Sequence, residues 1–208
     1  MTANEFYQKF ISVTKEDFVA TKAQLPDFPE WIGKTYREIY KCKEPAYTEL
    51  VNKKLIHEII EEAGLEAQHE YFRIDSIGYR HRYTEIDACE AEKVGLNRHF
   101  WDLKVAVEHE NNKADWMDEV TKLCHIRCTL KVIIGYNYCD QRDDGDAEKL
   151  EFIAKWMPEL SAFDPNSEEE ILIIIGNAAP KNKSYGTYER FDYRGYLYDY
   201  ESGTFKRI

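Results

Sequence analysis

Two almost continuous apolar runs constrain the fold of this chain more than any other feature. Residues 129–136 (TLKVIIGY) and 170–176 (EILIIIG) are strand-length segments that are too apolar to leave one face in water. Strands of this kind lie at the centre of a sheet whose two faces are covered by helices. The segment between them, residues 147–157, has the periodicity of a helix. We therefore expect an α/β fold with a mixed central sheet.

The other expected elements flank this core. Helices are predicted at residues 1–25, 46–63 and 115–125, strands at 70–79 and 100–110, and one or two Tyr-rich strands within 185–205. Pro45 opens the helix at 46–63 and Gly64 ends it. Residues 80–98 are polar and form an expected excursion between two strands. The predicted organisation is an N-terminal helical extension (residues 1–44) followed by one α/β domain (residues 45–208).

Composition narrows the class of protein. The 208 residues are 43% apolar, which is enough to build one core. The first twenty residues lack the apolar stretch of a signal peptide, and the longest apolar run, Ile171–Ile175, is far too short to cross a bilayer. The five cysteines are an odd number and lack the regular spacing of a disulfide framework, which suits a reducing compartment. The sequence thus predicts a cytoplasmic protein with no membrane partner.

The net charge of −11 argues against a simple nucleic-acid binder, because such proteins usually carry a basic footprint. Part of the acidity lies in residues 140–146 and 168–170, which are expected to be solvated. Basic residues cluster elsewhere, for example at Lys53–Lys54 and Lys206–Arg207. A local basic patch is therefore compatible with the total charge.

Three carboxylates form the main candidate site. Glu108 and Glu110 are two residues apart on a predicted strand, so both project from the same face. Two close carboxylates raise each other's pKa, and a divalent cation removes that penalty. Asp75 lies on the preceding predicted strand, which pairs with the Glu108 strand if the excursion joins them. Oxygen ligands of this kind are those that Mg²⁺ or Mn²⁺ prefers.

This layout resembles the PD-(D/E)XK nuclease superfamily, the restriction-endonuclease-like fold. The family pattern is a helix, a strand with an Asp, an apolar strand ending in (D/E)-x-K, a helix and another strand. Here the matching segments are residues 50–63, RIDSIGY with Asp75, VAVEHEN with Glu108 and Glu110, DWMDEVTKLCHI, and TLKVIIGY. The resemblance implies that Asp75, Glu108 and Glu110 bind the metal, and it covers residues 45–136.

The chain departs from the family pattern at Glu110, which stands where the pattern has Lys. Lys122 on the following helix is the candidate replacement, although an ordinary surface lysine is the simpler interpretation. The superfamily often adds a Glu from the first helix, and Glu58 is preferred for that role over Glu62. A competing register, Asp102-Leu103-Lys104, is literally D-x-K but precedes the apolar run instead of ending it.

Two other signals have structural interpretations. Cys124, His125 and Cys128 lack the second paired half of a zinc site, so small buried thiols are expected. His109, between the two glutamates, should point to the opposite face of its strand and pack there.

The function expected from the resemblance is a Mg²⁺-dependent or Mn²⁺-dependent endonuclease that hydrolyses DNA phosphodiester bonds. Members that cut duplex DNA commonly act as dimers, which makes a homodimer the expected assembly, and restriction or defence is a role by analogy. The alternative is a catalytically degenerate protein of the same fold that binds another protein, as an acidic immunity or anti-restriction factor. The missing Lys and the net charge of −11 both suit that alternative.

Overall fold

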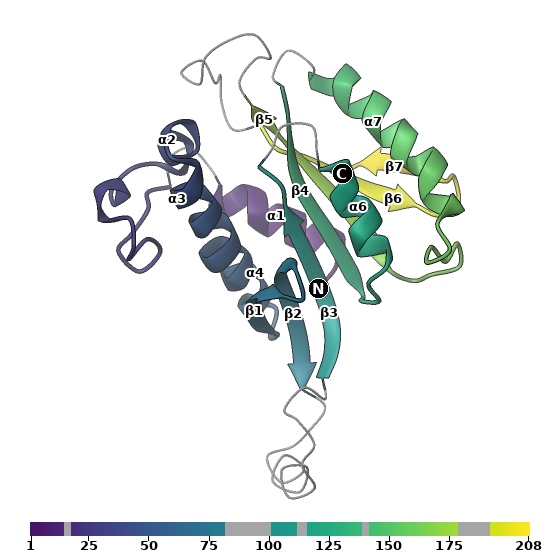
Figure 1. The fold of residues 1–208 in the computed structure, drawn as a ribbon, viewed down its shortest axis with the longest axis horizontal. Helices are drawn as coiled ribbons and strands as arrows, with labels where there is room; N and C mark the ends of the chain where they lie inside the picture. Colours follow the sequence, from purple (N-terminus) through teal and green to yellow (C-terminus); the bar gives the residue numbers. More distant parts are fainter. Residues whose placement is uncertain (15–17, 82–100, 112–115, 139–141, 179–191) are drawn as a thin grey trace, which may run out of the picture.

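The computed structural model describes residues 1–14, 18–81, 101–111, 116–138, 142–178 and 192–208. Within these residues, a seven-stranded mixed sheet runs in the order β1-β2-β3-β4-β5-β6-β7 and is flanked by helices. Figure 1 shows α6 and α7 in front of the sheet and α1 behind it. This is the mixed α/β class that the sequence predicts.

The strands are β1 (Glu66–Tyr71), β2 (Ile74–His81), β3 (Trp101–His109), β4 (Leu130–Tyr138), β5 (Glu170–Ala178), β6 (Arg194–Asp199) and β7 (Thr204–Arg207). The pairs β3–β4 and β4–β5 are parallel, whereas the outer pairs on both sides are antiparallel. The two most apolar segments of the sequence are therefore β4 and β5 in the sheet interior, as expected for strands covered on both faces.

The helices carry local sequence signals at some of their ends. They are α1 (Ala3–Val13), α2 (Tyr36–Cys42), the continuous segment α3 (Glu44–Glu49), η2 (Leu50–Leu55) and α4 (Ile56–Glu62), then α6 (Met117–Cys124) and α7 (Arg142–Trp156); short 3₁₀ turns are η1 (Pro29–Trp31) and η4 (Met157–Glu159). Thr2 and Glu5 form a capping box at α1. Gly64, with φ of 72°, follows α4 as the predicted terminator. No helix in these described ranges is long and apolar enough to span a membrane.

Alternation along the central strands divides the core into two layers. One face of the sheet packs on α1 to α4 and includes Val105, Val107, Val132, Ile134 and Ile174. The other face packs on α6 and α7 and includes Ala106, Ile133, Ile171, Ile173 and Ile175. Phe6, Phe10 and Ile39, from the predicted N-terminal extension, are buried in the first layer. Residues 1–44 thus contribute to the same core as the sheet.

Two predicted elements are wrong in extent. The helix predicted at residues 1–25 ends at Val13. Thr14 is its C-cap residue, and the Thr14 hydroxyl donates a hydrogen bond to the carbonyl of Phe10. The strand predicted at 70–79 is instead the end of β1, a two-residue turn and most of β2. The turn contains no Gly or Asn that would signal it. The predicted excursion at 80–98 and the start of the Tyr-rich tail lie largely outside the described residues.

Candidate functional site

Asp75 and Glu108 meet on adjacent antiparallel strands. Ser76 pairs with Val107, so Asp75 on β2 lies across from Glu108 on β3 at the next position in register. Both side chains share the face of Ile77 and Ala106, which is the face that α6 covers. A carboxylate oxygen of Asp75 accepts a hydrogen bond of 2.8 Å from the backbone N–H of His109. The sequence prediction that these two carboxylates converge is therefore matched by the geometry.

Lys122 reaches this pair from α6. Its ammonium lies 2.8 Å from Glu108 Oε1 and donates a 2.7 Å hydrogen bond to Glu119, one turn earlier on the same helix. The Lys122 side chain is 36% exposed, whereas Glu108 is 2% exposed. The Lys122 ammonium therefore lies between the buried Glu108 carboxyl group and the solvent. The structure brings Lys122 to the site, and it adds Glu119, which sequence reasoning missed.

The electrostatics of the cluster are unfavourable for two ionised carboxylates. Burial, together with the nearby negative charge of Asp75, raises the pKa of Glu108 to about 8, even though Lys122 acts in the opposite direction. Burial also raises the pKa of Asp75, although the His109 N–H opposes this shift. Glu108 Oε1 is buried and, despite its proximity to Lys122, accepts no hydrogen bond of normal geometry. Glu108 is therefore mostly protonated at neutral pH in the ligand-free protein.

Burial by itself would lower the pKa of Lys122, but the adjacent carboxyl groups of Glu108 and Glu119 outweigh burial and raise it. The side chain is therefore a stable cation at neutral pH. This places a positive charge beside Glu108, supplied by the helix that follows β3.

The other two predicted ligands are Glu110 and Glu58. Glu110 lies just past β3, is half-buried, and donates its backbone N–H to the carbonyl of Ile134 at 2.9 Å. Glu58 is exposed on α4, and α4 packs on the opposite face of the sheet from Glu108. Within the described residues, no group of three or more His, Cys, Asp or Glu side chains is placed to hold a metal ion.

The competing D-x-K register lies elsewhere. Asp102 pairs with Arg80 near the start of β3, far along the strand from Glu108, and the Asp102 carboxylate is 3.6 Å from Lys104. This pair is partly exposed. The apolar-run register, with Glu108, is the one that coincides with a convergence of acidic groups.

His109 supports the site from the opposite face, where it was predicted to pack. Its Nδ1 lies 2.7 Å from Asn52 Oδ1 and its Nε2 lies 3.0 Å from the Tyr136 hydroxyl. Burial lowers the pKa of His109 to about 3, so the ring is neutral. Because the backbone N–H of this residue holds Asp75, the packed imidazole fixes the strand position that orients the carboxylate. Asn52 was missed, although an amide within the apolar stripe of residues 50–56 was a usable signal.

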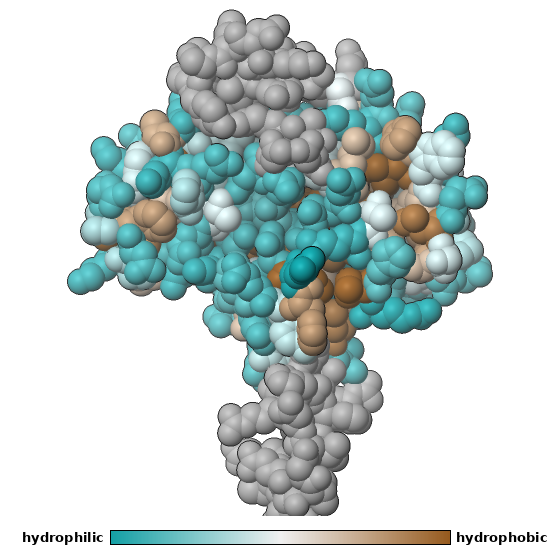
Figure 2. Space-filling model, viewed as in Figure 1, coloured by the Kyte–Doolittle hydropathy of each residue, from teal (hydrophilic) through white to brown (hydrophobic). Residues whose placement is uncertain are grey.

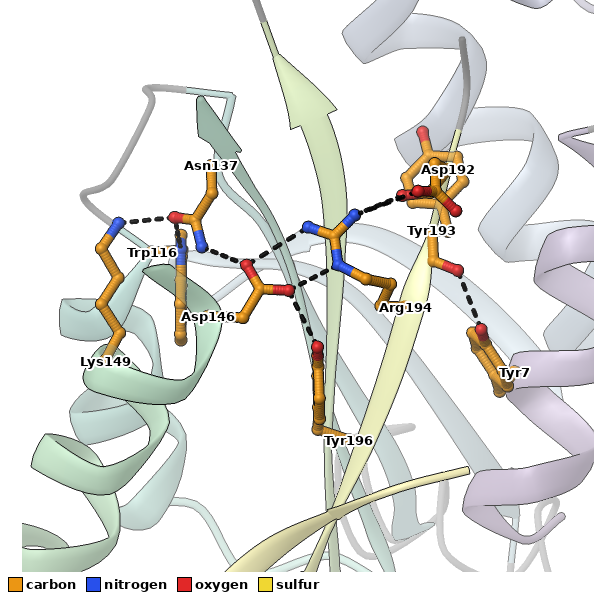
Figure 3. Close-up of polar contacts among 9 residues, drawn as sticks. All are labelled: Tyr7, Trp116, Asn137, Asp146, Lys149, Asp192, Tyr193, Arg194 and Tyr196. Carbon is orange, nitrogen blue, oxygen red and sulfur yellow. Dashed lines mark hydrogen bonds and ion pairs between the residues drawn. The ribbon is translucent and has the colours of Figure 1, made fainter. Parts of the chain in front are cut away.

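A second buried polar cluster lies on the face of the sheet that carries Glu108, and Figure 3 shows its contacts. Asp146 accepts hydrogen bonds from Nε (2.5 Å) and Nη2 (3.2 Å) of Arg194, from Asn137 (2.6 Å) and from the Tyr196 hydroxyl (2.9 Å). Asn137 in turn accepts from Lys149 at 2.5 Å. The expectation that residues 140–146 are solvated is wrong for Asp146, which is completely buried because Arg194 neutralises it.

The two cysteines that invited a zinc interpretation are buried thiols, as expected. Cys128 is held by a contact of 3.3 Å from its sulfur to the carbonyl of Leu130, and burial raises its pKa to about 12. Cys124 is also buried, whereas the intervening His125 is exposed. These groups have the character of core residues.

Comparison of the chain with protein-family models, with curated proteins and with solved structures finds no match. The interpretation of the site therefore depends on its own geometry. That geometry is a buried glutamate and a half-buried aspartate on adjacent strands, with a partly exposed lysine 2.8 Å from the glutamate.

Proposed function

We propose that the protein is a metal-dependent endonuclease that hydrolyses DNA phosphodiester bonds. The observation that carries the proposal is the placement of Asp75 and Glu108 across two paired strands, with Lys122 2.8 Å from Glu108. The element order α4, β1, β2, β3, α6, β4 supports it, because the PD-(D/E)XK resemblance implies a helix, strands that carry the two acids, a helix and a further strand. Restriction or defence is the biological setting that the resemblance suggests.

The residues present fit a hard divalent cation. Asp75 and Glu108 supply carboxylate oxygens, and the buried Glu108 Oε1 without a normal hydrogen bond is an acceptor that a cation would satisfy. Mg²⁺ is commonly held by one or two carboxylates, with water and substrate phosphate completing its coordination. A two-carboxylate site is therefore sufficient for Mg²⁺ or Mn²⁺. Glu110 and Glu58 are not needed as ligands in this proposal.

The chain's own groups have separate tasks in this reaction. A bound Mg²⁺ or Mn²⁺ supplies Lewis acidity and lowers the pKa of a bound water. Asp75 is held in place by the His109 N–H, so its carboxylate is oriented before substrate arrives. Lys122 presents an ammonium beside Glu108, where it stabilises the negative charge that develops on the phosphate oxygens. This is the role that Glu110 cannot perform as a cation.

A cleavage assay tests the proposal. Supercoiled plasmid DNA, circular single-stranded DNA and RNA are incubated with the protein in Mg²⁺, in Mn²⁺ and in EDTA. We expect metal-dependent cleavage of DNA that falls at least about 100-fold in Asp75→Asn, Glu108→Gln and Lys122→Met. Asp102→Asn is the matched control, because it removes a carboxylate from the other end of β3. Cleavage that survives EDTA, or that Glu108→Gln leaves unchanged, would contradict the proposal.

The expected homodimer is tested separately, by measuring the molar mass of the active protein in analytical ultracentrifugation.

One observation favours the alternative, an inactive protein of the same layout that acts as an acidic protein-binding factor in immunity or anti-restriction. Lys122 already occupies the position beside Glu108 that a cation would take. Calorimetric titration with Mn²⁺ separates the two proposals. Binding that is lost in Glu108→Gln supports the nuclease, whereas no binding at millimolar Mn²⁺ supports the alternative.

A further inference from the structure

The β1–β2 hairpin has a turn that its residues do not favour. Tyr71 pairs with Ile74, which leaves Phe72 and Arg73 as the two turn residues. Their φ angles are 47° and 64°, and Glu70 before them has φ of 53°. Two-residue hairpin turns with positive φ at both positions are normally built from Asn and Gly, because a Cβ is strained there. A bulky aromatic and an arginine at these positions therefore cost folding free energy.

The Phe72 ring gains little from burial in return. It is 82% exposed, the most exposed of the large apolar side chains in the described residues. Its recorded ring contact is an edge-on packing against Tyr71, with ring centroids 4.5 Å apart. Arg73 beside it is also exposed. Strained backbone that persists without a folding benefit points to a functional use of the side chains it presents.

This turn is attached directly to the carboxylate site. Asp75 follows Phe72 by three residues, a chain distance of about 10 Å at most. The ring of His69 on β1 donates from Nδ1 to the backbone carbonyl of Asp75 at 2.6 Å, which ties the two strands together beside the turn. The Phe72 ring would therefore meet a base close to a phosphate held at Asp75.

We propose that Phe72 stacks on an unpaired base of a nucleic-acid substrate, and that Arg73 contacts the adjoining phosphate. The inference rests on the proposed function and specifies its substrate class as single-stranded or locally unpaired DNA. An exposed aromatic ring beside a cation is the combination that binds single strands, because the face of a base is accessible to a side chain only when the base is unstacked. The Arg73 charge provides a local attraction for phosphate on a chain whose net charge is −11.

Fluorescence anisotropy in EDTA measures this contact without cleavage. The probes are labelled oligothymidylate and the duplex that it forms with oligoadenylate. We expect Phe72→Ala to bind the single strand about tenfold more weakly, with the duplex affinity unchanged, and Phe72→Trp to bind like the wild type. An unchanged single-strand affinity in Phe72→Ala would overturn the inference.

Phe152→Ala is the matched control for loss of an exposed aromatic ring. Phe152 is 57% exposed and packs against Trp156 on α7. Figure 2 shows hydrophobic residues gathered over the region of α7 on a face that is otherwise largely hydrophilic. We expect this variant to bind both probes like the wild type. An equal loss in Phe152→Ala and Phe72→Ala would show non-specific adhesion and overturn the inference.

A double variant separates binding from folding. Phe72→Asn with Arg73→Gly installs the residues that the turn prefers, so its melting temperature should rise by about 2–4 °C. Its affinity for the single strand should nevertheless fall at least as far as that of Phe72→Ala. A variant that is less stable than the wild type would show that the two side chains serve folding, and would overturn the inference.

The single-strand binding measurement and the cleavage assay can fail separately. If the wild type cleaves no DNA but Phe72→Ala weakens single-strand binding, the nuclease proposal fails and this inference holds. If the wild type cleaves DNA but Phe72→Ala binds normally, this inference fails and the nuclease proposal holds.

Discussion

Two acidic groups are buried on the same face of the sheet, but their surroundings differ. Asp146 receives four hydrogen bonds, two of them from the guanidinium of Arg194. Glu108 has the ammonium of Lys122 at 2.8 Å, but it also lies near the negative charges of Asp75 and Glu119. The first carboxylate is neutralised by its neighbours, whereas the second is destabilised by them.

The difference separates a folding role from a chemical one. A buried carboxylate whose acceptors are all used contributes order to the fold and leaves no capacity for a ligand. A buried carboxylate with a raised pKa and an oxygen without a normal hydrogen bond costs stability in the ligand-free protein, and such costs concentrate at functional sites. This contrast makes Asp75 and Glu108 the candidate site and Asp146 a structural residue.

The largest expected effect is on stability at Asp146. Asp146→Ala removes the buried carboxylate that accepts two hydrogen bonds from Arg194 and leaves the Asp192 carboxylate 3.6 Å from this guanidinium, so the free energy of unfolding should fall by about 3–5 kcal/mol. Urea unfolding followed by tryptophan fluorescence measures the change. Glu108→Gln is the control, and we expect it to be as stable as the wild type at neutral pH or more stable. Equal losses in both variants would remove the distinction between the clusters. If Asp146→Ala does not fold, Tyr196→Phe, which removes one donor to Asp146, should cost about 1 kcal/mol.

The next effect concerns pH. The Glu108 pKa is about 8 in the folded protein against an ordinary value of 4.5, so the folded state holds a proton that the unfolded state releases between these values. The stabilisation is fully present below pH 4.5 and is lost as pH rises to about 8, with a slope of at most about 1.4 kcal/mol per pH unit. Urea midpoints across this window measure it. The Glu108→Gln variant should lack this part of the slope; an identical pH profile in both proteins would contradict the raised pKa.

A smaller effect is expected from the metal. Mg²⁺ at about ten times its dissociation constant should raise the free energy of unfolding by about 1.4 kcal/mol, because it binds the folded state. Thermal melts in MgCl₂ are compared with melts in KCl of equal ionic strength. The gain should disappear in Asp75→Asn and remain in Asp199→Asn, which changes a surface carboxylate held by Lys206. A gain that survives in Asp75→Asn would locate the metal elsewhere.

The smallest effect is expected at Lys122. Lys122→Met removes the positive charge that holds the Glu108 pKa down, so this pKa should rise further. Because Lys122 is partly exposed, the free energy of unfolding should change by about 1 kcal/mol or less. Carbon-13 NMR of labelled glutamate side chains follows the titration. Lys149→Met is the matched control, since Lys149 bonds to the amide of Asn137; a similar pKa rise in this variant would show a general field effect.

Local patterns were enough to predict the central strands and part of the site. Because successive side chains of a strand point to opposite faces, Glu108 lies on one face of β3 and His109 on the other, whatever the rest of the fold is. The helical spacing of α6 puts Lys122 one turn from Glu119 on the same side, although Lys122 itself was named from the family resemblance. These relations depend on neighbouring residues and on backbone geometry that every strand or helix shares.

Other features had no signal in the neighbouring sequence. The turn at Phe72–Arg73 lacks Gly and Asn, so β1 and β2 were predicted as one strand. Glu58 was chosen from its place in an apolar stripe, but which face of the sheet receives a helix depends on the connections between elements. These errors arise where the chain adopts a strained or long-range arrangement that its local composition does not favour.

By itself, the sequence determined the fold class, the two interior strands and the opposite orientation of Glu108 and His109, because alternation and apolar runs are local properties. Only the tertiary structure decided which acids are neutralised. Asp146 looked solvated until Arg194, 48 residues away, was seen to bind it, and Glu108 became distinctive because Asp75 approaches it from another strand. Desolvation and charge pairing depend on all the groups around a side chain, and those groups are gathered by folding.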